Sequence, residues 1–383
     1  MKNIKKLTIL TLLLIAMTTS MSNVAIVTAL PHLKEYFTNI ANIEFYSRLM
    51  LTLPSLVIAL LAPFLGHFIF KFGKKKSVII ALISFSIIGS AGLYLESIEM
   101  LLFSRALFGI CVATLMIVST SLIGDYFKEH DRHKFMGYQS AFMALGGVVF
   151  VIGGGVLSDI SWRYSFAIYL IGFLLLPLAM TQLKEVIVKD DDKQIDIEVN
   201  SKMFYIYFLA FFYMLIFFIL PTQIPFLLIE TFKASGSFAG TIIAIAFLSN
   251  ALGAITFAKL KYKLSYSSIY IIGLAIIGIG FAGVGFINHT YYFFLTSPLL
   301  GFGGGLMMTN ITAWMLSKTN AKKRVKTSGY FTSALFLGQF SSPLVFHGLV
   351  SYYGVQHFFL IIGFSLLIIF ILSFIYVITK PKI

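Results

Sequence analysis

"HFIFKFGKKK", residues 67–76, places four lysines within six positions, between two long apolar segments of the chain. Charged residues make up only 11% of the 383 residues, whereas a soluble domain carries about 25%. Apolar segments of about 20 residues, long enough to cross a bilayer core about 30 Å thick, recur along the whole sequence. Because lipid offers no hydrogen-bond partner to the backbone, each segment is predicted to form a helix. The lysines then belong to a short connection between two membrane-spanning helices.

Twelve membrane-spanning helices are predicted, so the fold class is an all-α polytopic membrane protein. Their connections alternate between two sets of very different charge. One set, which includes both ends of the chain, holds 24 of the 29 basic residues, and the other holds only Lys34, Arg48, Arg105, Arg163 and Lys233. Since basic loops stay in the cytoplasm, both termini are predicted to be cytoplasmic. The predicted helices cover residues 7–30, 47–70, 77–95, 100–124, 137–157, 164–182, 203–229, 238–258, 266–287, 291–316, 328–350 and 356–378.

The chain contains an internal repeat with an offset of 192 residues. The segment GYQSAFMALG (137–146) aligns with GYFTSALFLG (329–338), and Gly109 aligns with Gly301. A charge-rich segment divides the two copies, so the predicted domains are two six-helix bundles at 1–182 and 203–383, joined by a cytoplasmic linker at 183–202. Two such bundles around a pseudo-two-fold axis are typical of transporters that bind their substrate near the membrane midplane.

With these features the sequence resembles the major facilitator superfamily over its whole length, and in particular its twelve-helix drug:proton antiporter branch. The family signature between helices 2 and 3, G-x-L-A-D-R-x-G-R-K, is matched by Gly66, Gly73, Lys74 and Lys75. The resemblance implies that this loop helps to hold the outward-facing state. However, Phe70 replaces the aspartate that makes the acidic contact in the family, and the lysines are also explained by topology alone.

A second signature is SRALFG, residues 104–109, which matches the family pattern R-x-x-x-G. The resemblance implies that Arg105 takes part in proton coupling. Arg105 lies about five residues into its predicted helix, or about 8 Å at 1.5 Å per residue, and a charge inside the membrane is costly and usually functional. The alternative is that Arg105 snorkels to the nearby outer interface.

The third signature of this branch is a glycine-rich helix 5 with a Gly-Pro kink. Gly137, Gly146, Gly154 and Gly155 match it, but Phe150 and Val151 occupy the Gly-Pro positions. These glycines would also permit close helix packing in any such bundle, so the direction of transport stays open.

Further candidates for proton coupling or gating lie at helix ends, because no acidic residue falls in the middle of a predicted helix. Glu44 and Arg48 are four residues apart, which predicts a pair on one helix face, either a gate or a plain interfacial ion pair. Asp125 ends helix 4, where a loop contact is the alternative. His347 lies near the outer end of helix 11 and could titrate at physiological pH, or it could simply form a hydrogen bond.

The predicted substrate cavity is weakly polar and rich in aromatic residues. Such a cavity suits amphipathic, neutral or loosely cationic compounds. Intramembrane amides also hold helices together, at about 1 kcal/mol each, which is the alternative for several of these residues. On the helices that the family fold places around the pore, the polar residues are Asn23, Tyr138, Gln139, Tyr213, Asn250, Asn310 and Gln339.

The predicted function is secondary-active, proton-coupled efflux of small amphipathic drugs or metabolites by alternating access, from a bacterial inner (plasma) membrane. A uniporter or uptake carrier for a small metabolite is the alternative, since helix 5 lacks its Gly-Pro kink. The sequence contains no zinc, nucleophile-elbow or Walker motif, so an enzyme is not predicted. The net charge of +14 is attributed to topology and not to nucleic-acid binding. We expect a monomer that uses protons and a small-molecule substrate in a lipid bilayer, without a cofactor or a metal ion.

Overall fold

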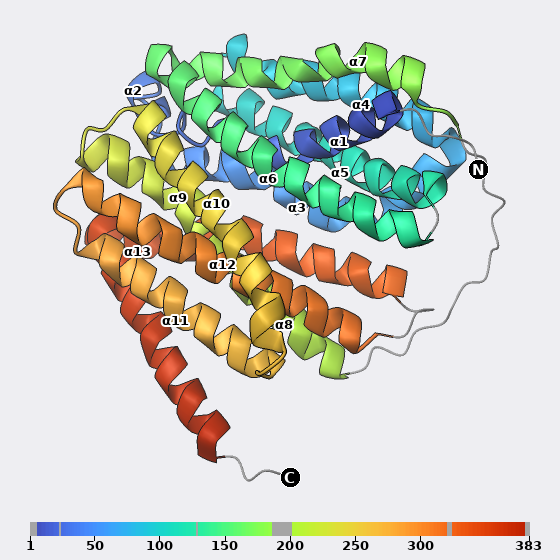
Figure 1. Cartoon of the computed structure of the whole chain (residues 1–383). Coiled ribbons are helices and arrows are strands. Elements are labelled where there is room, and N and C mark those ends of the chain that lie inside the picture. Colours follow the sequence, from blue (N-terminus) through green and yellow to red (C-terminus); the bar gives the residue numbers. More distant parts are fainter. Residues whose placement is uncertain (1–5, 23, 128, 186–200, 320–323, 380–383) are drawn as a thin grey trace. The chain divides into compact units, whose positions relative to one another are not determined.

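The computed structural model describes residues 6–22, 24–127, 129–185, 201–319 and 324–379. These residues form helices joined by turns, and none of them lies in a β-strand (Figure 1). The chain divides into two compact units, Met1–Ile195 and Asp196–Ile383. The division falls within the segment 183–202, which the sequence predicts to be a linker.

The first unit is a helical bundle in which α1 packs against α6, α3 against α5, and α4 against both α5 and α7. Its described elements are α1 (Lys6–Met21), α2 (Leu33–Tyr36), α3 (Ile43–Phe72), α4 (Lys74–Gly89), η1 (Ser90–Leu93), α5 (Ile98–Tyr126), α6 (Glu129–Ile160), η2 (Trp162–Leu170) and α7 (Ile171–Gln182).

The second unit repeats this arrangement, since α8 packs against α13, α10 against α12, and α11 against both α12 and α13. Helices at equivalent positions of the repeat therefore form the same pairs in the two units. The described elements are α8 (Ser201–Phe217), α9 (Ile219–Phe226), η3 (Leu227–Thr231), α10 (Gly236–Lys261), α11 (Tyr266–Gly285), η4 (Thr290–Tyr292), α12 (Phe293–Ser317) and α13 (Arg324–Thr379).

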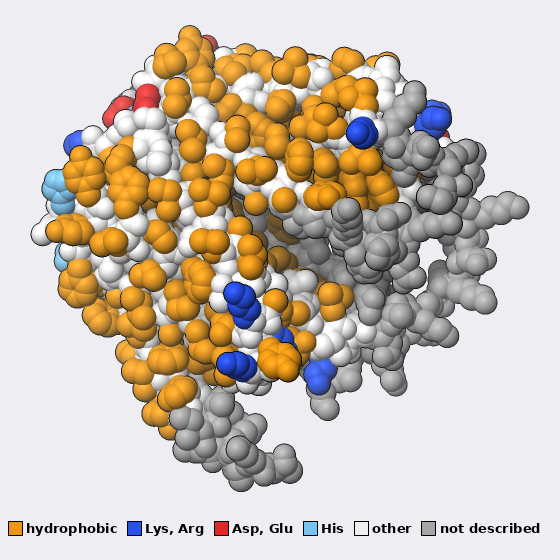
Figure 2. Space-filling model, viewed as in Figure 1, with side chains coloured by type: hydrophobic (Ala, Val, Ile, Leu, Met, Phe, Trp, Pro, Cys, Tyr) orange, Lys and Arg blue, Asp and Glu red, His pale blue; other side chains and the backbone are white. Residues whose placement is uncertain are grey.

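Ten helical segments in the described part of the chain are long and apolar enough to cross a membrane. In addition, α1 holds a shorter apolar helix, and Thr327–Ile375 contains two predicted helices that are separated at Gly354, where φ is 76°. Every predicted span thus has a helical counterpart, and the predicted fold class is confirmed. Figure 2 shows hydrophobic side chains over most of the visible described surface, as contact with lipid requires.

The largest difference from a predicted boundary is in the first helix, which ends at Met21 and not at residue 30. The hydroxyl groups of Thr18, Thr19 and Ser22 donate to the carbonyl oxygens three residues earlier, over 2.7, 2.7 and 2.9 Å. Such side-chain bonds compete with the helical ladder and bend a helix. From residue 24 to residue 32 the backbone forms turns instead.

The glycines of the repeat occupy equivalent contacts in the two units. A Cβ atom at Gly109 of α5 would lie 2.6 Å from the backbone oxygen of Pro54 on α3, and a Cβ atom at Gly301 of α12 would collide with the backbone oxygen of Ala246 on α10. Pro54 and Ala246 are themselves 192 residues apart, as Gly109 and Gly301 are. The sequence repeat therefore corresponds to a repeated close contact between helices.

Candidate functional site

Arg105 lies inside α5, about 10 Å along the axis from the helix start at Ile98. Its side chain is completely buried. Nη2 donates to the backbone oxygen of Gly89 over 2.5 Å, while Nε and Nη1 have no hydrogen-bond acceptor among the described residues. The guanidinium is enclosed by protein and is not exposed, as the end of a snorkelling side chain would be.

Three aromatic rings surround this guanidinium. Its Cζ atom lies 4.7 Å from the ring centroid of Phe108 and 5.0 Å from those of Phe166 and Tyr169; these three rings are called the aromatic cage below. Each cation–π contact contributes about 0.5–2 kcal/mol, with the larger values where water is excluded. No carboxylate in the described part of the chain interacts with Arg105. The cage and one carbonyl group therefore stabilise its charge.

The carbonyl group of Gly89 belongs to the last turn of α4, where η1 begins. The last carbonyls of a helix lack intrahelical donors, and a positive charge is favourable there. Arg163 serves the end of η1 in the same way, because its Nη1 donates to the backbone oxygens of Gly92 and Leu95, both over 2.9 Å. Arg105 thus caps a helix, and this structural role exists alongside any role in transport.

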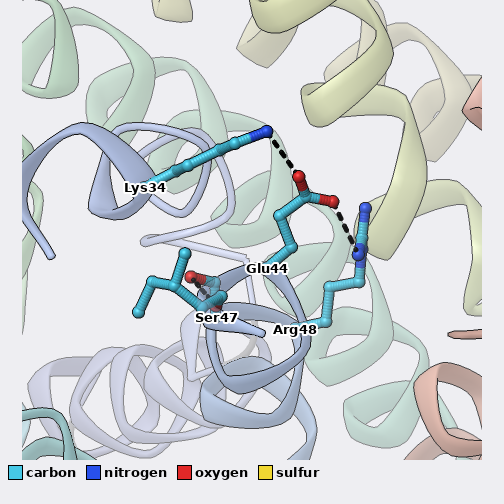
Figure 3. Close-up of polar contacts among 5 residues, drawn as sticks. Lys34, Glu44, Ser47 and Arg48 are labelled. Carbon is cyan, nitrogen blue, oxygen red and sulfur yellow. Dashed lines mark hydrogen bonds and ion pairs between the residues drawn. The ribbon is translucent and has the colours of Figure 1, made fainter. Parts of the chain in front are cut away.

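The predicted pair of Glu44 and Arg48 is present on α3 and includes a third residue, Lys34 of α2 (Figure 3). Glu44 Oε2 accepts from Arg48 Nη1 over 3.4 Å, and Glu44 Oε1 accepts from Lys34 Nζ over 2.5 Å. The side chain of Arg48 is 1% exposed and that of Glu44 is 31% exposed. We call these residues the ion triad. The shared helix face is confirmed, and the role as a gate stays a prediction.

A distant acidic residue holds the junction between α3 and α4, where the family signature lies. Gly73 has a φ of 93°, which favours glycine, and α4 begins at Lys74. The backbone N–H groups of Lys74 and Lys75 donate to the Glu185 carboxylate over 2.6 and 3.0 Å. A carboxylate is favourable at a helix N-terminus because it accepts from free N–H groups and complements the helix dipole. The loop thus has an acidic contact although Phe70 replaces the family aspartate.

The residues just before Glu185 contact two further helices. Thr8 Oγ1 of α1 donates to the backbone oxygen of Gln182 over 3.4 Å. The Tyr126 hydroxyl of α5 donates to the backbone oxygen of Lys184 over 2.7 Å and accepts from its N–H over 2.8 Å. The segment 182–185 at the end of α7 is therefore bonded to α1, α4 and α5.

Three of the four glycines predicted for helix 5 can be described, and all lie on α6. A Cβ atom at Gly146 would collide with Met17, and a Cβ atom at Gly154 would collide with the backbone oxygen of Ala25. Gly155 is buried, and its carbonyl accepts from Ser158 over 2.8 Å. Gly146 lets α6 approach α1 closely, and Gly154 lets it approach the turns that follow α1, which is the packing role that the sequence leaves open.

In the second unit, two predicted cavity residues lie together. Tyr213 of α8 is buried and stacks on Phe217 with ring centroids 5.6 Å apart, and its hydroxyl interacts with Asn250 of α10. Asn310 of α12 is completely buried, and its Nδ2 donates to the backbone oxygen of Tyr266 on α11 over 2.9 Å. Asn310 therefore joins two helices, as intramembrane amides often do.

Three buried amides in the second unit have an atom without a partner among the described residues. These atoms are Nε2 of Gln339 on α13, Oδ1 of Asn310 on α12 and Oε1 of Gln223 on α9, a residue that the sequence prediction did not include. An unpaired buried polar atom costs about 1–3 kcal/mol, so each would gain from contact with a polar ligand or water. His347, also on α13, is half-buried.

The remaining predicted residues carry less information. Asn23 lies outside the described residues, and the surroundings of Gly66, Asp125 and Gly137 on α3, α5 and α6 are likewise not among those described. On α6, Tyr138 is 49% exposed whereas Gln139 is 9% exposed, so these neighbours do not share one environment.

Sequence reasoning missed Lys34, Tyr169 and Glu185. A signal for Tyr169 exists, because Trp162, Phe166 and Tyr169 follow the i, i+4, i+7 spacing that places three rings on one helical face. Lys34 and Glu185 have no local signal, since they lie 10 and 111 residues from Glu44 and Lys74.

Comparison with known proteins gives a match to a family along almost the whole chain. The profile described as the Major Facilitator Superfamily matches residues 12–196 and 206–383. Multidrug resistance protein 1 of Bacillus subtilis is 34% identical over 110 residues, and the quinolone resistance protein NorA of Staphylococcus aureus is 32% identical over 110 residues. Each of these matches spans 28% of this chain and 28% of the relative.

Solved structures of transporters share the fold at low sequence identity. A bacterial homologue of the human lysosomal transporter Spinster, inward-facing and occupied, superposes with a TM-score of 0.82 at 16% identity, over 99% of this chain and 98% of that one. The nucleoside transporter NupG superposes with a TM-score of 0.79 at 13% identity, over 96% of this chain and 99% of that one. At these identities the similarity establishes the fold alone.

Proposed function

The chain belongs to the Major Facilitator Superfamily, a family of transporters, and we propose that it is a proton-coupled exporter of small amphipathic drugs or metabolites. The similarity of a 110-residue segment to multidrug and quinolone resistance proteins supports export of drugs. The uncharged polar pair of Tyr213 and Asn250, beside the ring of Phe217, supports a preference for neutral or weakly cationic compounds.

The observation that carries proton coupling is the ion triad. Glu44 is a titratable residue at the start of a membrane-crossing helix, and its side chain is partly accessible. When it is ionised, its carboxylate holds Lys34 of α2 and Arg48 of α3 together. A proton on this carboxylate removes the negative charge that attracts both cations. Protonation therefore weakens the link between α2 and α3, and deprotonation restores it.

Arg105 supplies a fixed positive charge in the same unit. Its guanidinium stays protonated at physiological pH, and it interacts with no carboxylate of the described residues. A fixed charge of this kind repels a proton or a cationic compound that comes close to it.

This proposal includes a location and a mode of operation. The protein lies in the bacterial plasma membrane with both termini in the cytoplasm, as the loop charges predict. It works as a monomer through alternating access of its two units, and it binds protons and a small-molecule substrate.

The test uses proteoliposomes with an imposed pH gradient, to which lipophilic dyes and antibiotics are added while the lumenal pH is followed. We expect proton movement on addition of particular compounds. In Glu44→Gln we expect the rate of this proton movement no longer to depend on pH. Glu99→Gln is the matched control, because Glu99 lies exposed in the first turn of α5. If Glu44→Gln and Glu99→Gln behave like the unaltered protein, the ion triad does not carry the proton.

One observation favours a second candidate function, uniport or uptake of a small metabolite. Phe150 and Val151 occupy the Gly-Pro positions of the antiporter signature on α6. In the same proteoliposomes, a radiolabelled metabolite that equilibrates while the pH gradient stays intact would select this candidate.

A further inference from the structure

Tyr169 makes two contacts that the proposed function does not use. The Arg105 Cζ atom lies over its ring, 5.0 Å from the centroid. Its hydroxyl donates to the backbone oxygen of Ser22 over 3.0 Å. The side chains of Tyr169 and Arg105 are both completely buried. One side chain of η2 thus joins the buried cation of α5 to Ser22, the residue that follows the end of α1.

The hydrogen bond to Ser22 satisfies a carbonyl group that has lost its helical donor. The Ser22 hydroxyl bonds back to Thr19, and the turns after residue 24 use the backbone oxygens of Val24, Ile26 and Ala29. A buried carbonyl without a donor is costly. Tyr169 therefore stabilises the end of α1 in its present place.

The ring of Tyr169 cannot move independently of its neighbours. It packs against Phe108 and Phe85, with ring centroids 4.9 and 5.7 Å away. A Cβ atom at Gly89 would lie only 2.7 Å from the Tyr169 Cβ atom, and the carbonyl of Gly89 accepts from Arg105. A displacement of the guanidinium therefore displaces the ring or breaks a contact with it.

We propose that Tyr169 is a positioning residue whose ring holds the Arg105 guanidinium and whose hydroxyl transmits the position of that cation to the end of α1. The proposal rests on the function proposed for Arg105, which is to supply a fixed positive charge when a proton is exchanged for a transported compound. When a proton or a cationic compound repels the guanidinium, the ring shifts and the hydrogen bond to Ser22 weakens. Tyr94 is the other described titratable residue that acts on Arg105, and its own hydroxyl already donates to the backbone oxygen of Ile87 over 2.7 Å.

The first test measures amide hydrogen exchange of the detergent-purified full chain, in peptides that cover residues 24–33. Tyr169→Phe keeps the ring over Arg105 and removes only the hydroxyl, which bonds Ser22 and also interacts with the Arg105 guanidinium, so we expect amide hydrogen exchange there to become about fivefold faster. Tyr270→Phe is the matched control, because the buried Tyr270 hydroxyl donates to the Leu209 oxygen of α8 over 3.0 Å in the second unit. We expect it to leave residues 24–33 unchanged. Equal exchange in Tyr169→Phe and the unaltered protein would overturn the proposal.

A double-mutant cycle separates transmission from simple packing. Arg105→Lys keeps the charge but loses the planar contact with the ring, so we expect it to speed exchange in residues 24–33 when Tyr169 is present. In the Tyr169→Phe background the same change should add nothing, since the hydroxyl that reaches α1 is missing. If the two effects multiply independently, Tyr169 does not transmit the position of Arg105 and the proposal is wrong.

The second readout is the pH at which dye-driven proton release is half-maximal in proteoliposomes. We expect Tyr169→Phe to shift this pH and Tyr270→Phe to leave it in place, because a purely structural loss lowers the rate without moving the midpoint. An unchanged midpoint in Tyr169→Phe would count against the proposal. If the unaltered protein moves no protons with any compound, the proposed function fails. The double-mutant cycle measured by amide hydrogen exchange still decides whether Tyr169 links Arg105 to the end of α1.

Discussion

The two units place different residues at the same position of the repeat, and Arg105 is the clearest case. Its equivalent 192 residues later is Ser297 on α12. Arg105 is buried, donates to the carbonyl of Gly89 and carries a charge. Ser297 is also buried and donates to the backbone oxygen of Ile242 over 2.6 Å, without a charge. A hydroxyl group is therefore sufficient to bond a neighbouring helix at this position.

The aromatic packing, in contrast, is partly common to both units. Phe166 of the aromatic cage corresponds to Phe358, which packs against Phe346 and Phe359 with ring centroids 5.5 and 5.7 Å apart. Tyr169 corresponds to Ile361, so at these positions the second unit has neither the guanidinium of Arg105 nor the phenol hydroxyl of Tyr169. The rings belong to the shared packing of the fold, and the charged and hydroxyl groups are particular to the first unit.

The ion triad follows the same rule. Glu44 and Arg48 of α3 correspond to Gly236 and Gly240 of α10. The second unit forms its bundle without charged residues at these two positions, and a buried charge such as that of Arg48 is costly inside a membrane. Packing alone therefore does not require the cations of the first unit, which supports a role for them in transport.

The largest expected effect comes from removal of the buried cation. We expect Arg105→Ala to lower coupled transport by about a hundredfold or more, since a preorganised charge is lost, while the protein still folds. Flux in proteoliposomes and thermal unfolding in detergent check the two parts. Arg105→Ser, which copies the second unit, should have the same effect on flux. Undiminished coupled flux in both variants would remove Arg105 from the mechanism and leave it only as a helix cap.

A smaller effect is expected from changes at the close helix contact that the two units share. We expect Gly109→Ala and Gly301→Ala each to destabilise the protein by about 1–3 kcal/mol, because the new methyl group meets a backbone oxygen in both cases. The thermal midpoint in detergent measures this loss. Gly348→Ala is the control, since no atom lies within 4 Å of a Cβ atom there. A loss confined to one unit would show that the repeated contact is not equivalent.

The smallest expected effect concerns the caps of α4 and α11. The N-terminus of α11 is capped locally by Ser265, whose Oγ accepts from the N–H of Ser268 over 3.1 Å, whereas the equivalent end of α4 is capped by the distant Glu185. We expect Ser265→Ala and Glu185→Ala each to cost about 0.5–1 kcal/mol in unfolding free energy, with Glu96→Gln in an exposed loop as the control. Only the effect of Glu185→Ala should decrease at high salt, because that cap is charged.

The sequence was sufficient for the features that depend on local pattern. Apolar segment length predicted the helical spans, the offset of 192 residues predicted the equivalence of Gly109 and Gly301, and the spacing of four predicted the pair of Glu44 and Arg48. The early end of α1 was missed because apolar character continues to Leu30, while hydroxyl groups within the helix interrupt it.

Contacts between distant segments could not be predicted in this way. The partners of Tyr169 and Glu185 lie 147 and 111 residues away, and no periodicity encodes such a distance. The cage around Arg105 has the same origin, since its rings come from α5 and η2. A single sequence identifies the residues whose side chains could form such contacts. The packing of the helices determines which of these residues contact one another.

The bonds of the segment 182–185 have a mechanical consequence. This segment is the last described part of the first unit before the chain continues into the second. A pull transmitted along the chain from the second unit would reach α1, α4 and α5 together, through Thr8, Tyr126 and Glu185. Because the force is divided over three helices, we expect α7 to move together with α1, α4 and α5 and not to separate from them.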